Sequence, residues 1–455
     1  MPARGILNSM LSVLLSLLAA QQPAAPQLAK VHILNPPCPV QGAMFGQSVS
    51  ILDLDGDGVL DVATGASGEG MVYIFRGRPA GAKKAFGPPR LFSSSGPEQC
   101  PAPSSDDMFG WDVWSAQLDG DAADELIVGA PHEDVAGVAN VGAAYLIGYG
   151  ASGATPVRLP SPALDSGNFG SSVTAGDFDG DGLQDVAVGA RLATHGTTGD
   201  VAGRVYVWFG PVDPSAAPLV IENPNPVLFG NLAHHLAVGD TNGDGKDDLV
   251  VNALGNGAAG VPVAGQVFVY ESPIGQVPTH TIEDPSPNPQ DLPGPRYGMG
   301  IDARGPWVVV GANRKDSAGI HDPGRGFTQS GPNFTDVVVH DHPSPKESDY
   351  LGFRCAIADV IGDSALDFSF IAMPKINLAD PNPRAILTWD GNARFGPPAR
   401  IRLAIPGSQD HFANGLDRGD LFPGGKEEIL LGDMSYDRPG LGGADNSGRV
   451  VIYSF

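Results

Sequence analysis

Basic residues are scarce in this chain, and their scarcity limits the partners it can bind. Among 455 residues there are 27 Lys and Arg against 51 Asp and Glu, so the formal net charge is −24 at pH 7. No stretch of the sequence gathers positive charge into a patch. Nucleic acids and anionic membrane surfaces are bound mainly by such patches. The composition therefore argues against both as partners.

Cysteine is also rare, and three residues cannot build a disulfide scaffold for a chain of this length. Cys38 and Cys100 precede successive repeat units at similar distances, so a disulfide between neighbouring units is possible. Sequence alone does not fix the pairing. We expect Cys355, which lies in a strand-like stretch, to be a buried free thiol.

Long apolar runs are missing, and the longest one near the start is too short to span a bilayer. It covers Met10 to Leu18, follows Arg4, and precedes the small residues Ala19 and Ala20. This order is typical of a secretory signal peptide, which we predict over residues 1–20. No membrane span is expected. We predict a secreted protein, extracellular or periplasmic.

Recognisable catalytic motifs are missing as well. The sequence contains no G-x-S-x-G, no H-E-x-x-H and no phosphate-binding loop. His234 and His235 form the one adjacent histidine pair, and neighbouring residues of a regular strand point to opposite faces. We therefore expect that this pair does not converge on one metal. No catalytic residue is assigned, and the chain is not expected to be an enzyme.

Acidic nonapeptides, by contrast, are conspicuous. "DLDGDGVLD" begins at Asp53, "DFDGDGLQD" at Asp177 and "DTNGDGKDD" at Asp240. Asp-Gly pairs also form ordinary acidic turns. Three copies with one spacing favour a metal site instead, because a central cation turns the repulsion between carboxylates into attraction. Carboxylate and carbonyl oxygens in a flexible loop suit Ca²⁺, and glycines allow the tight wrap.

The expected ligands are the side chains at positions one, three, five and nine and the backbone carbonyl at position seven. In chain order these are Asp53, Asp55, Asp57, Val59, Asp61, Asp177, Asp179, Asp181, Leu183, Asp185, Asp240, Asn242, Asp244, Lys246 and Asp248.

Two degenerate copies are weaker candidates. One contains Asp119, Asp121 and Glu125, and the other contains Asp359, Asp363 and Asp367. We therefore expect at least three Ca²⁺ ions and up to five. Each loop runs into a short strand-like stretch such as "DVAVGA", unlike an EF-hand, which lies between helices. We expect calcium in loops that join strands.

A repeat underlies these loops. Phe-Gly or a weaker equivalent opens units near residues 45, 109, 169, 229, 297, 351 and 412, spaced by roughly sixty residues, which lies near the propeller range. Each unit reads as four short strands, and no long stretch has helical periodicity. We predict an all-β, seven-bladed β-propeller with four-stranded blades, formed as a single domain over residues 28–455.

The two ends of the repeat region complement each other. The last unit stops after its third strand, at Phe455, whereas an unassigned strand-like stretch covers Ala29 to Pro37. We predict that this N-terminal strand completes the last blade. Pairing of this kind closes the ring and covers an open sheet edge.

The combination of Phe-Gly, D-x-D-x-D-G-x-x-D and Gly-Ala-Pro, here in "VGAP" at Val128 to Pro131, resembles the FG-GAP repeat of integrin α-chain propellers. The resemblance is strong in the first four units and weak in the last three. It implies a seven-bladed propeller, calcium between the first and second strands, and partner recognition on the opposite face. It does not imply an integrin.

Function is expected on the face opposite the acidic loops. Long segments after Ala190, Ala312 and Gly432 join second to third strands there, and loops on a rigid scaffold often bind ligands. We expect a protein- or glycan-binding adhesion module in which calcium is structural. The alternative is a secreted, calcium-dependent polysaccharide lyase or hydrolase. The tripeptide Arg418-Gly419-Asp420 is interpreted as a remnant of an acidic loop.

Overall fold

The computed structural model describes most of the chain. The described residues are 30–99, 106–148, 155–258, 260–288, 294, 296–317, 319–373, 385–393, 398–402, 412–422, 426–434 and 447–454. The predicted signal peptide and Cys100 lie outside these residues.

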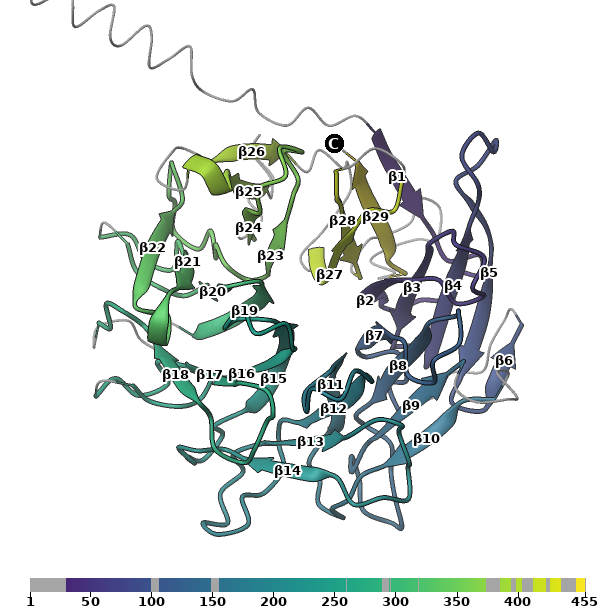
Figure 1. Cartoon of the computed structure of the whole chain (residues 1–455), viewed down its shortest axis with the longest axis horizontal. Helices are drawn as coiled ribbons and strands as arrows, with labels where there is room; N and C mark the ends of the chain where they lie inside the picture. The colour runs from purple at the N-terminus through teal and green to yellow at the C-terminus, as the bar shows by residue number, and fades with distance from the viewer. Residues whose placement is uncertain are drawn as a thin grey trace, which may run out of the picture.

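Seven antiparallel sheets stand around a central axis, which confirms the predicted seven-bladed propeller (Figure 1). The first three blades contain β2 (Phe45–Leu52), β3 (Asp61–Ala66), β4 (Met71–Gly77) and β5 (Phe86–Ser93); β7 (Val113–Ala116), β8 (Glu125–Ala130), β9 (Ala143–Ile147) and β10 (Val157–Pro160); and β11 (Phe169–Gly176), β12 (Asp185–Ala190), β13 (Arg204–Trp208) and β14 (Leu219–Glu222). The first blade carries an additional short strand, β6 (Gly96–Glu98).

The next three blades repeat the same order. They contain β15 (Leu232–Gly239), β16 (Asp248–Ala253), β17 (Gln266–Tyr270) and β18 (His280–Glu283); β19 (Tyr297–Arg304), β20 (Trp307–Ala312), β21 (Arg325–Ser330) and β22 (Asp336–Asp341); and β23 (Cys355–Ala358), β24 (Asp367–Ala372), β25 (Ala385–Trp389) and β26 (Ala399–Arg402).

Helix is confined, within the described residues, to two short 3₁₀ turns, η1 (Pro332–Phe334) and η2 (Gly391–Ala393). No helix among these residues is long and apolar enough to cross a membrane.

The seventh blade is assembled from both ends of the repeat region. It contains β27 (Phe412–Gly419), β28 (Glu428–Asp433), β29 (Arg449–Ser454) and the N-terminal strand β1 (Lys30–Leu34). β1 pairs antiparallel with β29 in a register that joins Lys30 to Ser454 and Leu34 to Val450. The predicted closure of the ring by the N-terminal strand is confirmed.

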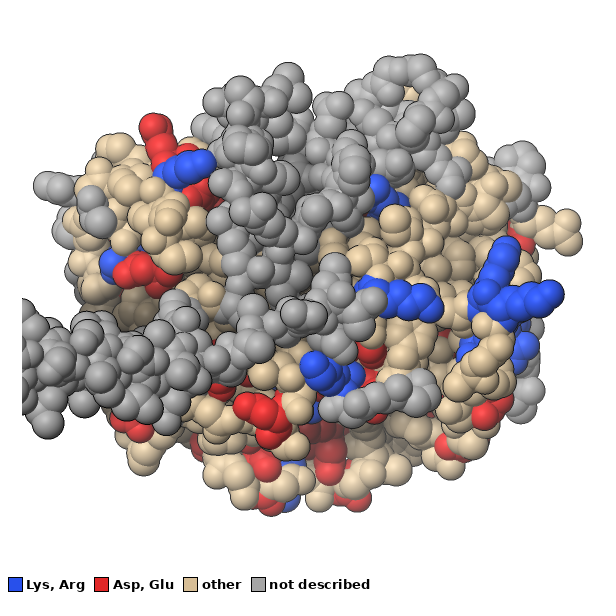
Figure 2. Space-filling view, turned by 90° about the horizontal axis from the view of Figure 1, so that it is seen from above, with Lys and Arg blue, Asp and Glu red and all other residues tan. Residues whose placement is uncertain are grey.

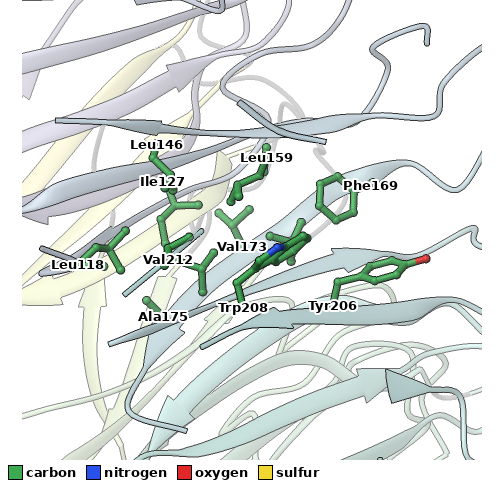
Figure 3. Packing of buried hydrophobic residues seen from close by; sticks show 14 of the residues in the cluster. Leu118, Ile127, Leu146, Leu159, Phe169, Val173, Ala175, Tyr206, Trp208 and Val212 are labelled. Carbon is green, nitrogen blue, oxygen red and sulfur yellow. The ribbon is translucent and has the colours of Figure 1, made fainter. Parts of the chain in front are cut away.

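The core lies between neighbouring blades, because each sheet packs its faces on the sheets beside it. Second strands such as β12 are buried along their whole length. Between the second and third blades, Ile127, Leu146 and Leu159 meet Phe169 and Trp208 (Figure 3). Burying residues of this size stabilises the ring by about 1.5–3 kcal/mol each.

Glycines allow the blades to approach closely where strands converge on the axis. The Phe-Gly glycines Gly46 and Gly170 have φ of 91° and 89°. A Cβ on Gly129, in the Gly-Ala-Pro motif of the second blade, would collide with the backbone carbonyl of Gly170 in the third blade. Gly432 of the seventh blade stands in the same relation to Gly46 of the first. Both halves of the repeat signature thus serve one contact between blades.

The fourth blade departs from the predicted alignment of the repeat. Leu232 pairs with Ala253 as Phe169 pairs with Ala190, and Ala233 has the positive φ of 61° that glycine supplies elsewhere. The structural equivalent of Phe-Gly is therefore Leu232-Ala233, and the assignment of Phe229-Gly230 was wrong. The spacing in the sequence agrees with this alignment, since Leu232 lies as far before Asp240 as Phe169 lies before Asp177.

Closure by β1 gives a testable prediction. A variant that begins at residue 36 retains Cys38 but lacks β1, so the backbone groups of β29 are left at an open edge. We expect a lower melting temperature and self-association in size-exclusion chromatography. The control begins at residue 28 and keeps the strand. Equal melting curves and equal elution of the two variants would show that β1 does not close the ring.

Candidate functional site

The acidic nonapeptides join first to second strands, so antiparallel topology places all of them on one face of the ring. The loop from Asp53 to Asp61 links β2 to β3, and those from Asp177 and Asp240 link the corresponding strands of the third and fourth blades. The loops between second and third strands lie on the opposite face. We call the two faces the acidic-loop face and the long-loop face.

In the first of these loops the chain wraps around the carboxylate at position one. Asp53 accepts hydrogen bonds from the backbone N–H groups of Asp57 at 3.1 Å and Gly58 at 2.8 Å. Carboxylate oxygens of Asp53, Asp55 and Asp57 lie within 4.8 Å of one another. Arg76 of β4 forms an ion pair with Asp55. The loop thus brings three carboxylates together around one point, with one cationic side chain at its edge.

The loop from Asp177 has the same geometry. Asp177 accepts the N–H groups of Gly180 at 2.8 Å, Asp181 at 3.0 Å and Gly182 at 3.0 Å. Oxygens of Asp177, Asp179 and Asp181 again lie within 4.8 Å of one another. The donor set consists of oxygen alone, which fits a hard cation such as Ca²⁺.

The loop from Asp240 repeats the wrap with one amide in place of a carboxylate. Asp240 accepts the N–H groups of Gly243 at 2.7 Å and Gly245 at 3.0 Å, and Asn242 Oδ1 accepts that of Asp244 at 2.9 Å. The backbone of Lys246 donates to Asp244 at 3.0 Å. The loop supplies less negative charge than the other two, so a cation would be held there less strongly.

The two degenerate loops differ from each other. In the second blade, oxygens of Asp119, Asp121 and Glu125 lie within 4.8 Å of one another, although Gln117 occupies position one. In the sixth blade, Asp359 accepts the N–H groups of Gly362 at 2.6 Å and Ser364 at 2.9 Å. The wrap therefore persists there without a carboxylate at position three.

Position nine has a role that the sequence analysis missed. Its carboxylate is buried and turned toward backbone N–H groups, as Asp185 accepts those of Phe178 and Gly210, each at 2.7 Å. Asp248 does the same with Thr241 at 2.8 Å and Ser272 at 3.0 Å. Each of these carboxylates fastens the loop and the end of the third strand to the second strand. Whether position nine also ligates an ion stays a prediction.

Burial raises the pKa of these carboxyl groups at position nine. The pKa of Asp61 and of Asp185 is raised to about 6, and that of Glu125 and of Asp367 to about 7. Desolvation is the main cause; the backbone N–H groups lower these values, and neighbouring acidic side chains raise them further. A bound cation would favour the ionised form and oppose this shift.

The side chain at position eight links three of the loops between first and second strands to the preceding blade. The N–H of Asp53 donates to Asp124 at 2.7 Å, and the N–H of Asp177 donates to Asp247 at 3.0 Å. The N–H of Asp359 donates to Glu427 at 2.8 Å. At each junction, position one of one blade meets position eight of the next. Polar residues at position eight were visible in the sequence, but nothing in it showed that they act across blades.

The adjacent histidines do not behave as predicted. A register shift between Leu232 and Leu236 breaks the alternation of β15. As a result, His234 and His235 both line a cavity on the axis of the ring, which we call the axial cavity, with ring centroids 4.6 Å apart. The prediction that the pair points to opposite faces was wrong because it assumed a regular strand. His235 Nε2 instead lies 2.6 Å from Arg354 Nη1.

The Arg-Gly-Asp tripeptide is not presented as a free loop. Arg418 lies in β27, lines the axial cavity, and pairs with Asp302 at 3.0 Å. Asp420 occupies position one of its unit, and Glu428 at position nine accepts the N–H of Leu421 at 2.8 Å. These contacts support the interpretation of a remnant acidic loop.

Cysteines fall into two groups. Cys38 is disulfide-bonded, whereas Cys355 is a buried free thiol. Because Cys100 lies outside the described residues, its pairing with Cys38 stays a prediction.

Exposed apolar side chains gather on the long-loop face. Leu228 is 61% exposed and Phe229 58% exposed, in the loop that joins the third blade to the fourth. The N–H of Phe229 donates to Val201 at 2.7 Å, and the N–H of Gly255 donates to Gly230 at 2.9 Å. Two neighbouring loops therefore hold this segment in place while its side chains face solvent.

Charged side chains are unevenly placed on the side of the molecule that Figure 2 shows. Acidic residues gather along its lower edge, and Lys and Arg stand in small separate groups. On this side, the described surface presents no extended basic area of the kind that nucleic acids require.

Comparisons with known proteins agree with the fold. The family model of the FG-GAP repeat matches residues 45–79, 169–208 and 233–270, so the chain contains FG-GAP repeats. The third match begins after Phe229-Gly230, in agreement with the alignment of the fourth blade.

Two kinds of protein are similar to part of the chain. The phosphatidylinositol-glycan-specific phospholipase D of Bos taurus is 35% identical over 165 residues, which cover 32% of this chain and 18% of that protein. Integrin alpha-PS2 of Drosophila melanogaster is 32% identical over 195 residues, covering 38% of this chain and 13% of the integrin. Integrin alpha-8 of Mus musculus is 27% identical over 191 residues, covering 40% and 16%. The chain thus spans less than a fifth of the length of these relatives.

The contact at position eight gives a prediction about stability. Asp124→Ala removes the acceptor of the Asp53 N–H, and we expect the free energy of unfolding to fall by about 1 kcal/mol. Asp124→Asn keeps an acceptor oxygen and should retain most of the stability. Chemical denaturation measures the difference. If both variants unfold at the same denaturant concentration, the hydrogen bond between blades contributes nothing.

Proposed function

We propose that this FG-GAP propeller is a secreted binding module that recognises a protein or glycan ligand through its long-loop face, with calcium in a structural role. The observation that carries the proposal is the exposed pair Leu228 and Phe229 on that face. Apolar side chains of this size, held in a fixed loop, are typical of surfaces that bind a partner. The similarity to integrin α chains supports the same function.

Calcium belongs to this proposal because the acidic loops fit it. Asp53, Asp55 and Asp57 would hold one ion, and the loops from Asp177 and Asp240 would each hold another. A bound ion would supply positive charge that offsets the repulsion between carboxylates. The acidic loops lie on the opposite face from Leu228 and Phe229, so the ions would stabilise the ring without touching the ligand.

An enzymatic function is the second candidate, and one observation favours it. The chain is 35% identical, over 165 residues, to a phosphatidylinositol-glycan-specific phospholipase D. By this analogy the chain would be a secreted hydrolase. A secreted polysaccharide lyase or hydrolase is a further possibility within the enzymatic candidate. The long-loop face would then position a substrate.

A combined binding and turnover experiment separates the two candidates. The secreted protein is applied to glycan and extracellular-protein arrays, and is also assayed for cleavage of glycosylphosphatidylinositol and polysaccharide substrates. We expect saturable binding that Phe229→Ser weakens, without turnover. The control, Val277→Ser, changes an exposed apolar residue of the fourth blade in the loop between its third and fourth strands. Turnover that long-loop substitutions abolish would instead establish the enzyme.

Calcium removal gives a separate prediction. At millimolar Ca²⁺, sites with the 10⁻⁴–10⁻³ M dissociation constants of extracellular modules would each stabilise the fold by about 0.5–1.5 kcal/mol. Asp179→Ala should lower the number of bound ions by one and reduce the melting temperature in Ca²⁺, but not in chelator. Glu347→Ala, which removes an exposed carboxylate outside the acidic loops, is the control.

Elemental analysis counts the ions, and calorimetry gives the melting temperatures. Mg²⁺ should restore stability poorly, because it demands stricter octahedral geometry. Identical melting curves in chelator and in Ca²⁺, together with no ion in the purified protein, would contradict the calcium assignment.

A further inference from the structure

A cavity of about 450 Å³ lies on the axis of the ring, lined by residues from all seven blades. This volume is within the range of small-molecule sites. First strands run from the long-loop face toward the acidic-loop face, so the order of residues along them gives the depth. Trp111, His234 and Arg354 come soon after the Phe-Gly position and lie toward the long-loop face. Asp302 and Arg418 come later and lie deeper.

The deep part of the cavity holds two carboxylates, Asp302 and Asp417, and one guanidinium group, Arg418. Arg418 pairs with Asp302 at 3.0 Å, and its Nε donates to the carbonyl of Ile357. Asp417 accepts the N–H of Ile51 at 2.8 Å and that of Arg418 at 2.8 Å. These contacts bind the fifth, sixth, seventh and first blades together, and Asp417 leaves one negative charge in excess in the deep part.

The two histidines near the long-loop face add no positive charge. A guanidinium group only donates hydrogen bonds, so His235 Nε2, at 2.6 Å from Arg354 Nη1, accepts and the ring is neutral. Burial, together with the charges of Arg354 and Arg191, lowers the pKa of His234 to about 3 and that of His235 well below its usual value. Both therefore act as neutral polar groups at pH 7.

Two guanidinium groups face one carboxylate in this upper part. Asp112 interacts favourably with the charge of Arg354 and also accepts the N–H of Val173 at 2.9 Å. Arg191 follows β12 at the long-loop face, and its side chain has no hydrogen bond or ion pair with the described residues. Its Nε is shielded from solvent, and burial lowers its pKa. In this upper part, one positive charge is thus left over among the described residues, whereas the three arginines and three aspartates that line the whole cavity balance one another.

Arg191 is half-buried and its shielded Nε has no hydrogen-bond partner among the described residues, so an anionic partner would offset the desolvation of its guanidinium group. We propose that the opening of the axial cavity on the long-loop face binds a single carboxylate group of a ligand, with Arg191 as its principal partner. The proposal deepens the proposed binding function and rests on it, since it names the chemistry of the ligand.

The surroundings favour a carboxylate over a more highly charged anion. One leftover positive charge matches a monoanion, and the planar guanidinium fork matches the two oxygens of a carboxylate. Trp111, Phe353 and Met299 line the same cavity and provide apolar walls for the organic part of the ligand. His234 Nδ1 is buried without a hydrogen-bond partner among the described residues, and it can form one further hydrogen bond.

Calorimetric titration of the whole secreted chain tests the proposal. The probes are N-acetylaspartate α-amide, which carries a peptide-type carboxylate, glucuronate, which carries a sugar-type carboxylate, and inorganic phosphate. We expect saturable binding of at least one carboxylate, and Arg191→Gln should weaken it about tenfold or more, the effect of losing a charge-assisted hydrogen bond. Arg191→Lys should retain part of the affinity.

Arg90→Gln, which removes an exposed guanidinium from the outer strand β5, is the matched control and should bind like the wild type. Tighter binding of the peptide-type probe than of the sugar-type probe, or the reverse, identifies the source of the carboxylate. Three results would overturn the site: no saturable binding of either carboxylate to the folded protein, equal affinity in Arg191→Gln, or phosphate bound more tightly than both carboxylates.

The array experiment keeps the two proposals apart. An array ligand whose binding depends on Phe229 but not on Arg191 would remove the carboxylate site and leave the proposed binding function intact. Carboxylate binding that depends on Arg191, together with turnover in the cleavage assays, would retain the site and replace the binding function with an enzymatic one.

Discussion

Close backbone contact between neighbouring blades is the constraint on which the rest of the ring depends. A glycine from a second strand lies against the Phe-Gly glycine of the next blade, as Gly129 lies against Gly170. A Cβ on either residue would force the two sheets apart near the axis, where strands are most crowded. The recurrence of Phe-Gly in this chain follows from that packing. The Phe side chain fills the core, and the glycine leaves room for the backbone of the neighbouring blade.

The acidic loops are tied to the ring by residues that a metal-binding motif does not explain. Position eight accepts a hydrogen bond from the preceding blade, as Asp124 does from Asp53, and position nine holds the N–H groups at the ends of its own strands, as Asp185 does. A cation in the loop would therefore act on a network that already joins adjacent blades. This geometry would couple ion binding to the cohesion of the ring.

Local spacing made the number of blades and the acidic loops predictable, because each is encoded in a short stretch. The search for Phe-Gly misaligned the fourth blade. Phe229-Gly230 matches the motif in sequence, whereas Leu232-Ala233, which occupies the position in the structure, does not. Counting back from Asp240 would have found the true position. The axial cavity could not be predicted, since Arg191 and Arg354 lie far apart in sequence and line one cavity only when the ring closes. The bulge that turns His234 and His235 to one side likewise has no sequence signature.

The pairing of β1 with β29 also orders events in time. Residues 30–34 leave the ribosome before the other strands of the ring, whereas their hydrogen-bonding partners, residues 449–454, leave it after them. Until then the seventh sheet lacks a strand, and bringing such distant segments together carries the entropic cost of closing a very long loop. Complete folding must follow synthesis of the whole repeat region. The pairing that stabilises the finished ring therefore also delays its closure until the last blade has been synthesised.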